Sequence, residues 1–195
     1  MAELVLASKS PRRIELIKNI TENFEVLPSD SEETYPEGTD IFDIPQLLAA
    51  QKALNVAEKR PDALIVGCDT VVVIHDKILG KPKDENEAVK MLMTLSGETH
   101  IVVSGVFIRY RKKSLSFTQK TRVTFYEFTE DDAKRYVKEC NPLDKAGSYA
   151  VQDKGMLFVK EIEGDYYNIV GLPVARLNLE IQKLLKLAGD ENGLV

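Results

Sequence analysis

Residues 63–74, ALIVGCDTVVVI, decide the fold, because this run is apolar except at Gly67, Asp69 and Thr70. Successive side chains of a strand point to opposite faces, so a continuously apolar run predicts a strand that is buried on both faces. Such a strand needs a layer of helices on each side of its sheet. The run therefore predicts an α/β fold.

The sequence on either side of this run alternates between predicted strands and helices. Apolar periodicity, helix caps and turn residues give the boundaries. We expect strands over 4–7, 24–27, 63–74, 100–110, 115–128, 149–151, 156–162 and 166–170, and helices over 11–19, 45–59, 84–95, 131–139 and 173–189. A turn-rich acidic loop spans 28–43. We therefore expect a single domain, residues 1–195, built on a mixed β-sheet with helices on its faces.

The composition is ordinary for a soluble globular protein, with 44% hydrophobic and 29% charged residues. A net charge of −5 argues against a general nucleic-acid coat, which would be basic. We interpret the basic run 109–113 as a solvated hairpin tip, with nucleic-acid contact as the alternative. Cys68 and Cys140 suggest no disulfide framework, and no apolar run approaches the ~20 residues of a membrane helix. We expect a cytoplasmic protein with no nucleic-acid or membrane partner.

Residues 6–13, LASKSPRR, predict a strand that turns into a helix, with Ser10 as N-cap before a proline. Acidic residues are favoured in a first helical turn, but here it carries Arg12 and Arg13. Backbone N–H groups, guanidinium groups and the hydroxyls of Ser8 and Ser10 would together suit a phosphate. The alternative is a solvated basic turn without a ligand.

Asp69 and Lys52 are the two strongest chemical candidates inside predicted elements. An unpaired carboxylate buried in a strand costs several kcal/mol, so Asp69 needs a cation, a metal or hydrogen bonds. It can ligate Mg²⁺ or accept a proton from water; the alternative is a hydrogen bond to a neighbouring loop. Lys52 lies four residues from Leu48 and from Val56, so it shares a helix flank with apolar residues. The alternative for Lys52 is a lysine whose stem merely covers the core.

Four further polar residues lie in predicted loops or at their edges. Lys81 stands in a rigid Gly-Lys-Pro turn before a helix, without the surrounding pattern of a Walker A loop. Glu33 lies in the acidic loop. Lys145 and Gln152 frame residues 144–152, DKAGSYAVQ, and the amide of Gln152 can hydrogen-bond the edge of a nucleobase. We take Lys145 and Gln152 as candidates for substrate binding.

Six short motifs follow one another along the chain. They are LASxSPRR (6–13), GxDT (67–70), GKP (80–82), LSGxTH (95–100), DKAGxYxxQ (144–152) and VGLP (170–173). Each is weak alone, but the series resembles the Maf proteins, the "septum formation" family of nucleoside triphosphate pyrophosphatases, over nearly the whole chain.

The resemblance implies a reaction, a cofactor and a set of site residues. The family cleaves a nucleotide between its α- and β-phosphates, which gives a nucleoside monophosphate and pyrophosphate. Its proton acceptor corresponds to Asp69, and the family needs a divalent cation, Mg²⁺ or Mn²⁺. We expect Asp69 and Glu33 to ligate this cation. The remaining polar positions of the family's active site correspond to Ser8, Arg13, Glu33, Lys52 and Lys81.

The resemblance also implies a substrate preference and a fold. Three positions separate the family's branches, and Arg12, Thr70 and Gln152 look like the branch that acts on dTTP and UTP. The family fold is an elongated α/β domain related to inosine triphosphatases, with two lobes around a cleft, and homodimers are common. A second hypothesis is a nucleotide-responsive binding module in cell-division control, in which hydrolysis is incidental.

Overall fold

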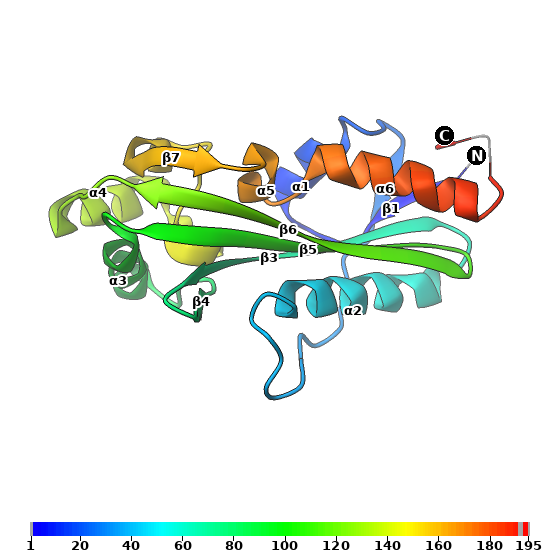
Figure 1. Cartoon of the computed structure of the whole chain (residues 1–195), viewed down its shortest axis with the longest axis horizontal. Coiled ribbons are helices and arrows are strands. Elements are labelled where there is room, and N and C mark those ends of the chain that lie inside the picture. The colour runs from blue at the N-terminus through cyan, green and yellow to red at the C-terminus, as the bar shows by residue number, and fades with distance from the viewer. Residues whose placement is uncertain (1, 191–192, 195) are drawn as a thin grey trace. The chain divides into compact units, whose positions relative to one another are not determined.

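The computed structural model describes residues 2–190 and 193–194 of the chain (Figure 1). It divides into two compact units. The first unit comprises Met1–Asp69, Ser104–Gln119 and Gly171–Val195, and the second unit comprises Thr70–Val103 and Lys120–Val170. Each unit collects segments that are distant in sequence, so neither is a continuous piece of chain. The expectation of a single domain over 1–195 stays a prediction.

One mixed sheet of seven strands underlies the fold. Its order is β2 (Phe24–Val26), β1 (Leu4–Leu6), β3 (Leu64–Ile74), β5 (Thr99–Tyr110), β6 (Lys113–Phe125) and β7 (Val159–Glu163), with β4 (Lys77–Leu79) also paired to β3. Strand β1 runs parallel to β2 and to β3, whereas β4 pairs with β3, and β7 with β6, in antiparallel register. The predicted mixed sheet is thus confirmed.

The first unit contains the helices α1 (Pro11–Ile17), α2 (Ile44–Lys59) and α6 (Val174–Leu187). Figure 1 shows α2 and α6 on opposite sides of the strands of this unit. Every residue of β1 and the first five residues of β3 are buried, as expected for strands covered on both faces. The two-sided burial that residues 63–74 predict is therefore confirmed in this unit.

The second unit contains α3 (Glu85–Leu95), α4 (Glu130–Cys140), α5 (Tyr166–Val170) and three short 3₁₀ helices. The 3₁₀ helices are η1 (Pro142–Asp144), η2 (Ala146–Ser148) and η3 (Lys154–Phe158). Thr129 caps α4, since its side chain accepts a hydrogen bond from the N–H of Asp132. Phe125 is fully buried, and the rings of His100, Tyr149 and Phe158 surround it.

The predicted strands over 149–151 and 166–170 are wrong, and the one over 156–162 is shifted towards its C-terminal end. Residues 149–150 are irregular, 151–153 form a turn, 154–158 form η3, and 159–163 form a strand. Residues 166–170 form the helix α5, because Asp165 Oδ1 accepts from the N–H of Tyr167 at 2.8 Å and caps a helical turn. Here a local side-chain cap overrides the β-propensity of tyrosine, isoleucine and valine.

Strand β4 was not predicted from the sequence. His75 and Asp76 both adopt positive φ, 48° and 55°, which is the conformation of a tight two-residue hairpin turn. The turn brings 77–79 back onto β3. Across residues 2–190 and 193–194, no helix combines the length and apolar character required to cross a bilayer.

Candidate active site

Lys52 joins two carboxylates in the first unit. Its Nζ lies 2.5 Å from Asp69 Oδ1 and 2.9 Å from Glu33 Oε1. The side chains of Lys52 and Asp69 are each 14% exposed, whereas that of Glu33 is 55% exposed. The shielded pair of Lys52 and Asp69 therefore interacts more strongly than an ion pair at the surface does. The contact of Lys52 with the solvent-exposed Glu33 is weaker. The structure thus brings together three residues that the sequence picked out separately.

Close packing of α2 on β3 lets Lys52 reach Asp69. A Cβ at Gly67 would lie 2.9 Å from Ala53 Cβ and would collide with the carbonyl oxygen of Ala49. Only glycine fits there, and two alanines on α2 face it. Lys52 precedes Ala53 on the helix, and Asp69 lies two residues beyond Gly67 on the same strand. The small residues therefore set the distance between the lysine and the carboxylate.

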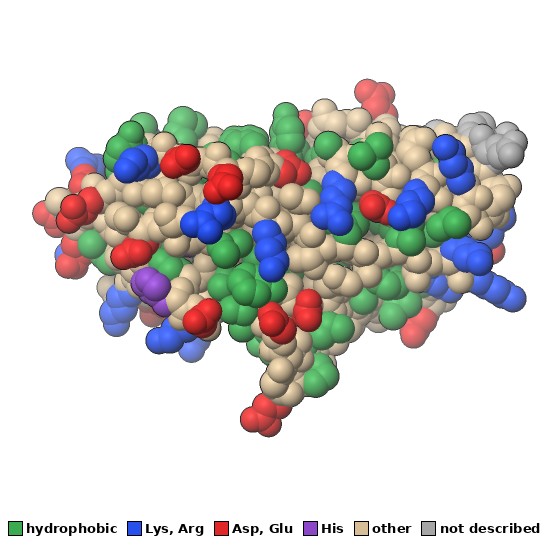
Figure 2. Space-filling model, viewed as in Figure 1, with side chains coloured by type: hydrophobic (Ala, Val, Ile, Leu, Met, Phe, Trp, Pro, Cys, Tyr) green, Lys and Arg blue, Asp and Glu red, His purple; other side chains and the backbone are tan. Residues whose placement is uncertain are grey.

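The acidic loop that carries Glu33 is held on one flank of α2. Acidic side chains of this loop stand out on the surface (Figure 2). Gln51 accepts from the N–H of Thr34 at 3.4 Å and donates to the carbonyl of the same residue. One turn further along α2, Asn55 Oδ1 accepts from Ser29 Oγ at 3.1 Å. These contacts tie residues 29–34 to the helix and so position Glu33 next to Lys52.

The donor set can hold a hard divalent cation. Two carboxylates against one ammonium leave a local surplus of negative charge, and carboxylate oxygens are the ligands that Mg²⁺ prefers. In the described parts of the chain, no group of three or more His, Cys, Asp or Glu side chains is placed to hold a metal. A metal at Asp69 and Glu33 would therefore need oxygen ligands from substrate phosphates or water, which is the usual arrangement for Mg²⁺.

The predicted strand-to-helix corner is organised by Arg13. Its Nε donates to the carbonyl of Gly171 at 2.9 Å, and its Nη1 donates to the carbonyl of Cys68 at 2.8 Å and to Ser8 Oγ at 3.4 Å. Ser8, itself buried, also accepts from the N–H of Ser10 at 3.2 Å. Since Cys68 immediately precedes Asp69, Arg13 fixes the backbone beside the candidate base.

The start of α1 agrees only in part with its prediction. Ser10 occupies the N-cap position with extended backbone, φ −65° and ψ 119°, but its side chain makes no capping hydrogen bond. The first turn carries no acidic residue, and Arg12 is partly buried in it. The phosphate-binding role predicted for this corner stays a prediction.

The second unit carries the other candidates. The N–H of Gly147 donates to the carbonyl of Gly80 at 3.0 Å, which joins the loop of Lys81 to the segment of Lys145. Gly147 adopts a φ of 68°, and a Cβ there would lie 2.8 Å from Val72 Cγ2, so this junction requires glycine.

Lys145 and Gln152 differ in how much they are shielded. Lys145 is 13% exposed, and its Nζ lies 2.7 Å from Asp144 Oδ1. Lys81 and Gln152 are exposed, and Thr70 follows Asp69 on β3 as the first residue of the second unit. The sequence did not single out Tyr136 and Asp153. The hydroxyl of Tyr136 accepts from the N–H of Ala150 and donates to Asp153 Oδ1, so its two contacts lie before and after Gln152 in the chain. Tyr136 and Asp153 are 17 residues apart, so the sequence carries no local signal for their contact.

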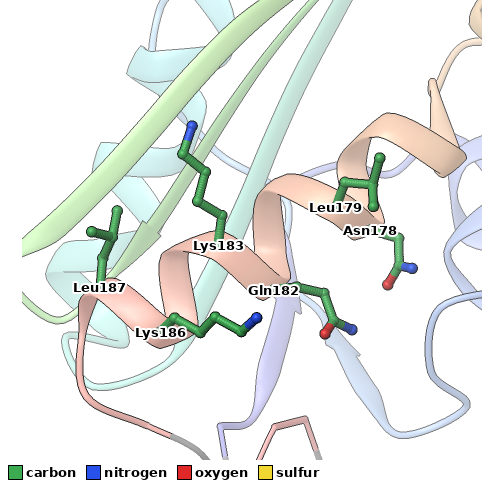
Figure 3. A pocket seen from close by; sticks show the side chains of 6 residues that line it. All are labelled: Asn178, Leu179, Gln182, Lys183, Lys186 and Leu187. Carbon is green, nitrogen blue, oxygen red and sulfur yellow. The ribbon is translucent and has the colours of Figure 1, made fainter.

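A shallow hollow lies on the outer face of α6. Figure 3 shows its lining, which consists of Asn178, Leu179, Gln182, Lys183, Lys186 and Leu187. It includes none of the residues predicted for the site and no carboxylate. The hollow is therefore not the predicted active site.

Comparisons with known proteins find relatives over nearly the whole chain. The dTTP/UTP pyrophosphatase of Bacillus cereus is 48% identical over 183 residues, which cover 94% of this chain and 96% of that one. The dTTP/UTP pyrophosphatase of Bacillus cytotoxicus is 47% identical over 183 residues, which again cover 94% of this chain and 96% of that one. A HAM1 protein from Coxiella burnetii has a TM-score of 0.50 at 13% identity, over 94% of this chain and 100% of that one, and this likeness confirms the predicted fold class. The sequence model described as "Maf-like protein" matches residues 3–184, and the chain therefore belongs to the Maf family.

Proposed function

We propose that this protein hydrolyses dTTP and UTP, and modified pyrimidine nucleotides of the same shape, to the nucleoside monophosphate and pyrophosphate. The observation that carries the proposal is the shielded contact of 2.5 Å between Lys52 Nζ and Asp69 Oδ1 in a Maf-family chain. The names of the Bacillus relatives support the choice of dTTP and UTP.

The reaction needs a base beside a fixed water molecule. The water oxygen forms a bond to the α-phosphorus, the bond from this phosphorus to the α,β-bridging oxygen breaks, and pyrophosphate leaves with the electron pair. Asp69 takes the proton from the water. Because Lys52 engages Oδ1, we assign the proton to Oδ2, and Lys52 keeps the carboxylate in one orientation.

Cationic side chains would offset the charge that the phosphates carry. We assign this role to Lys52, Arg13, Lys81 and Lys145, with the hydroxyl of Ser8 as a further donor. Arg12, Thr70 and Gln152 would distinguish the nucleobase.

Asp69 and Glu33 would hold a divalent cation, Mg²⁺ or Mn²⁺. When bound, the cation would neutralise charge on the phosphate oxygens. Lys52 already contacts both carboxylates, so its ammonium orients the same pair that would ligate the metal.

We further infer that the protein acts in the cytoplasm on free nucleotides rather than on nucleic acid. Cys68 and Cys140, far apart in sequence, suggest no disulfide framework, and the net charge of −5 disfavours a polyanionic partner. A homodimer is the expected assembly, which light scattering after size exclusion would measure.

The proposal is tested by pyrophosphate release from dTTP, UTP, CTP, dATP, GTP and 7-methyl-GTP, with Mg²⁺ and with a chelator. We expect turnover that depends on the metal and is fastest with dTTP and UTP. A purine preference would keep the reaction but reject the roles of Arg12, Thr70 and Gln152. Tight nucleotide binding without pyrophosphate release would favour the binding-module hypothesis instead.

A further inference from the structure

The segment around Gln152 has almost no regular secondary structure. Residues 149–150 are irregular and 151–153 form a turn, between the 3₁₀ helices η2 and η3. Gln152 is exposed, whereas Tyr149 and Val151 are buried. No strand ladder holds this backbone, so contacts from side chains elsewhere must fix its course.

Tyr136 of α4 supplies two of these contacts through a single hydroxyl. Its Oη accepts from the N–H of Ala150 at 3.1 Å and donates to Asp153 Oδ1 at 2.9 Å. The same Asp153 oxygen accepts from the N–H of Gly155 at 2.8 Å. The hydroxyl therefore ties the chain two residues before Gln152 and one residue after it.

The surroundings of Tyr136 favour this arrangement. Burial raises the pKa of Tyr136 well above its usual range, so the hydroxyl stays protonated and able to donate. Its ring packs against that of Phe158, with 5.3 Å between the centroids. A Cβ at Gly155 would collide with the carbonyl oxygen of Ala150, which shows how tightly the segment folds back on itself.

A second anchor is Tyr149, which lies one residue before Ala150 in the chain. The hydroxyl of Tyr149 lies 2.7 Å from His100 Nε2, and both rings meet Phe125 edge-on at centroid distances of 4.9 and 4.8 Å. This pair is fully inside the core of the second unit and holds the start of the segment. From Tyr149 to Asp153, Gln152 is the one residue that is exposed.

We propose that Tyr136 is a positioning residue for substrate choice, which acts by fixing the backbone on both sides of Gln152. The proposal rests on the proposed function, because it takes Gln152 as the residue that hydrogen-bonds the nucleobase. With the hydroxyl in place, the Cα–Cβ bond of Gln152 keeps one direction, and the backbone part of the ordering cost of base recognition is already met in the folded protein.

The test compares kcat and KM for dTTP, UTP and CTP in Tyr136→Phe, Gln152→Ala and the double variant. Tyr136→Phe keeps the ring and removes only the hydroxyl, so we expect kcat/KM for dTTP and UTP to fall about tenfold, chiefly through KM. The preference over CTP should fall by a similar factor. In the Gln152→Ala background, Tyr136→Phe should change the preference no further, since the two residues act in series. Tyr126→Phe, at an exposed tyrosine of the same unit, is the matched control and should behave as wild type.

The outcomes separate this inference from the proposed function. If Gln152→Ala lowers the preference but Tyr136→Phe does not, the positioning role is wrong and the proposed function stands. If Tyr136→Phe lowers kcat for all three nucleotides alike, in both backgrounds, its role is only structural and the inference is overturned. If Gln152→Ala leaves the preference unchanged, the role of Gln152 fails and the inference fails with it. Should Tyr136→Phe not fold, Asp153→Ala removes the acceptor and must give the same loss of preference.

Discussion

The buried imidazole of His100 should make the stability of this protein depend on pH. Burial lowers the pKa of His100 from 6.5 to about 4. Between these two values the unfolded chain binds a proton that the folded chain does not, so stability is complete above pH 6.5 and falls as the pH falls towards 4. With these two pKa values, proton linkage lowers the free energy of unfolding by about 2 kcal/mol between pH 7.5 and pH 5.

The assay is urea unfolding of wild type and His100→Phe at pH 7.5, 6.5, 5.5 and 5. The phenyl ring keeps the contact with Phe125 but cannot titrate. We expect His100→Phe to be less stable at pH 7.5, because it loses the contact with Tyr149, but to lose about 2 kcal/mol less than wild type on acidification. His75→Gln, at the exposed histidine, is the matched control for removing an imidazole. Parallel pH profiles for wild type and His100→Phe would refute the reasoning.

Three further substitutions test the first unit. Lys52→Met leaves the shielded carboxylate of Asp69 without its cation. We expect the free energy of unfolding in urea to fall by about 1–3 kcal/mol and kcat to fall by at least about a hundredfold. An unchanged kcat would contradict the orienting role of Lys52. Gly67→Ala forces a Cβ into the backbone of α2 and should lower the melting temperature by several degrees. Gly80→Ala is the control, because a Cβ at Gly80 meets no atom within 4 Å, and it should leave the melting temperature unchanged. Equal melting temperatures for the two variants would reject the packing argument. Arg13→Lys keeps the charge but cannot make both carbonyl contacts, so kcat/KM should fall about tenfold in a steady-state assay; wild-type kinetics would show that these contacts are dispensable.

Much of the fold could be predicted because its signals are local. The apolar run of β3 predicts two-sided burial, which is confirmed. The helix over 166–170 was missed because its cap, Asp165, precedes residues whose propensities favour a strand. Propensity is a weak prior where a side chain can satisfy the backbone in another way.

The site was predicted as separate residues and not as an arrangement. Asp69 stood out because a carboxylate inside a buried strand needs a partner. Its contact with Lys52 depends on the close approach of α2 at Gly67, which involves residues far apart in sequence. The role inferred for Tyr136 depends in the same way on a helix and a loop that meet only in the folded chain.

The most direct test of the central claim is Asp69→Asn, with nucleotide binding and pyrophosphate release measured on the same protein. The amide keeps the size of the carboxylate but cannot accept the proton from water, so dTTP should still bind while kcat falls at least about a thousandfold. Loss of Asp69 as metal ligand is checked by repeating the assay over a range of Mg²⁺ concentrations. Turnover close to that of wild type at any Mg²⁺ concentration would contradict the assignment of Asp69 as the base.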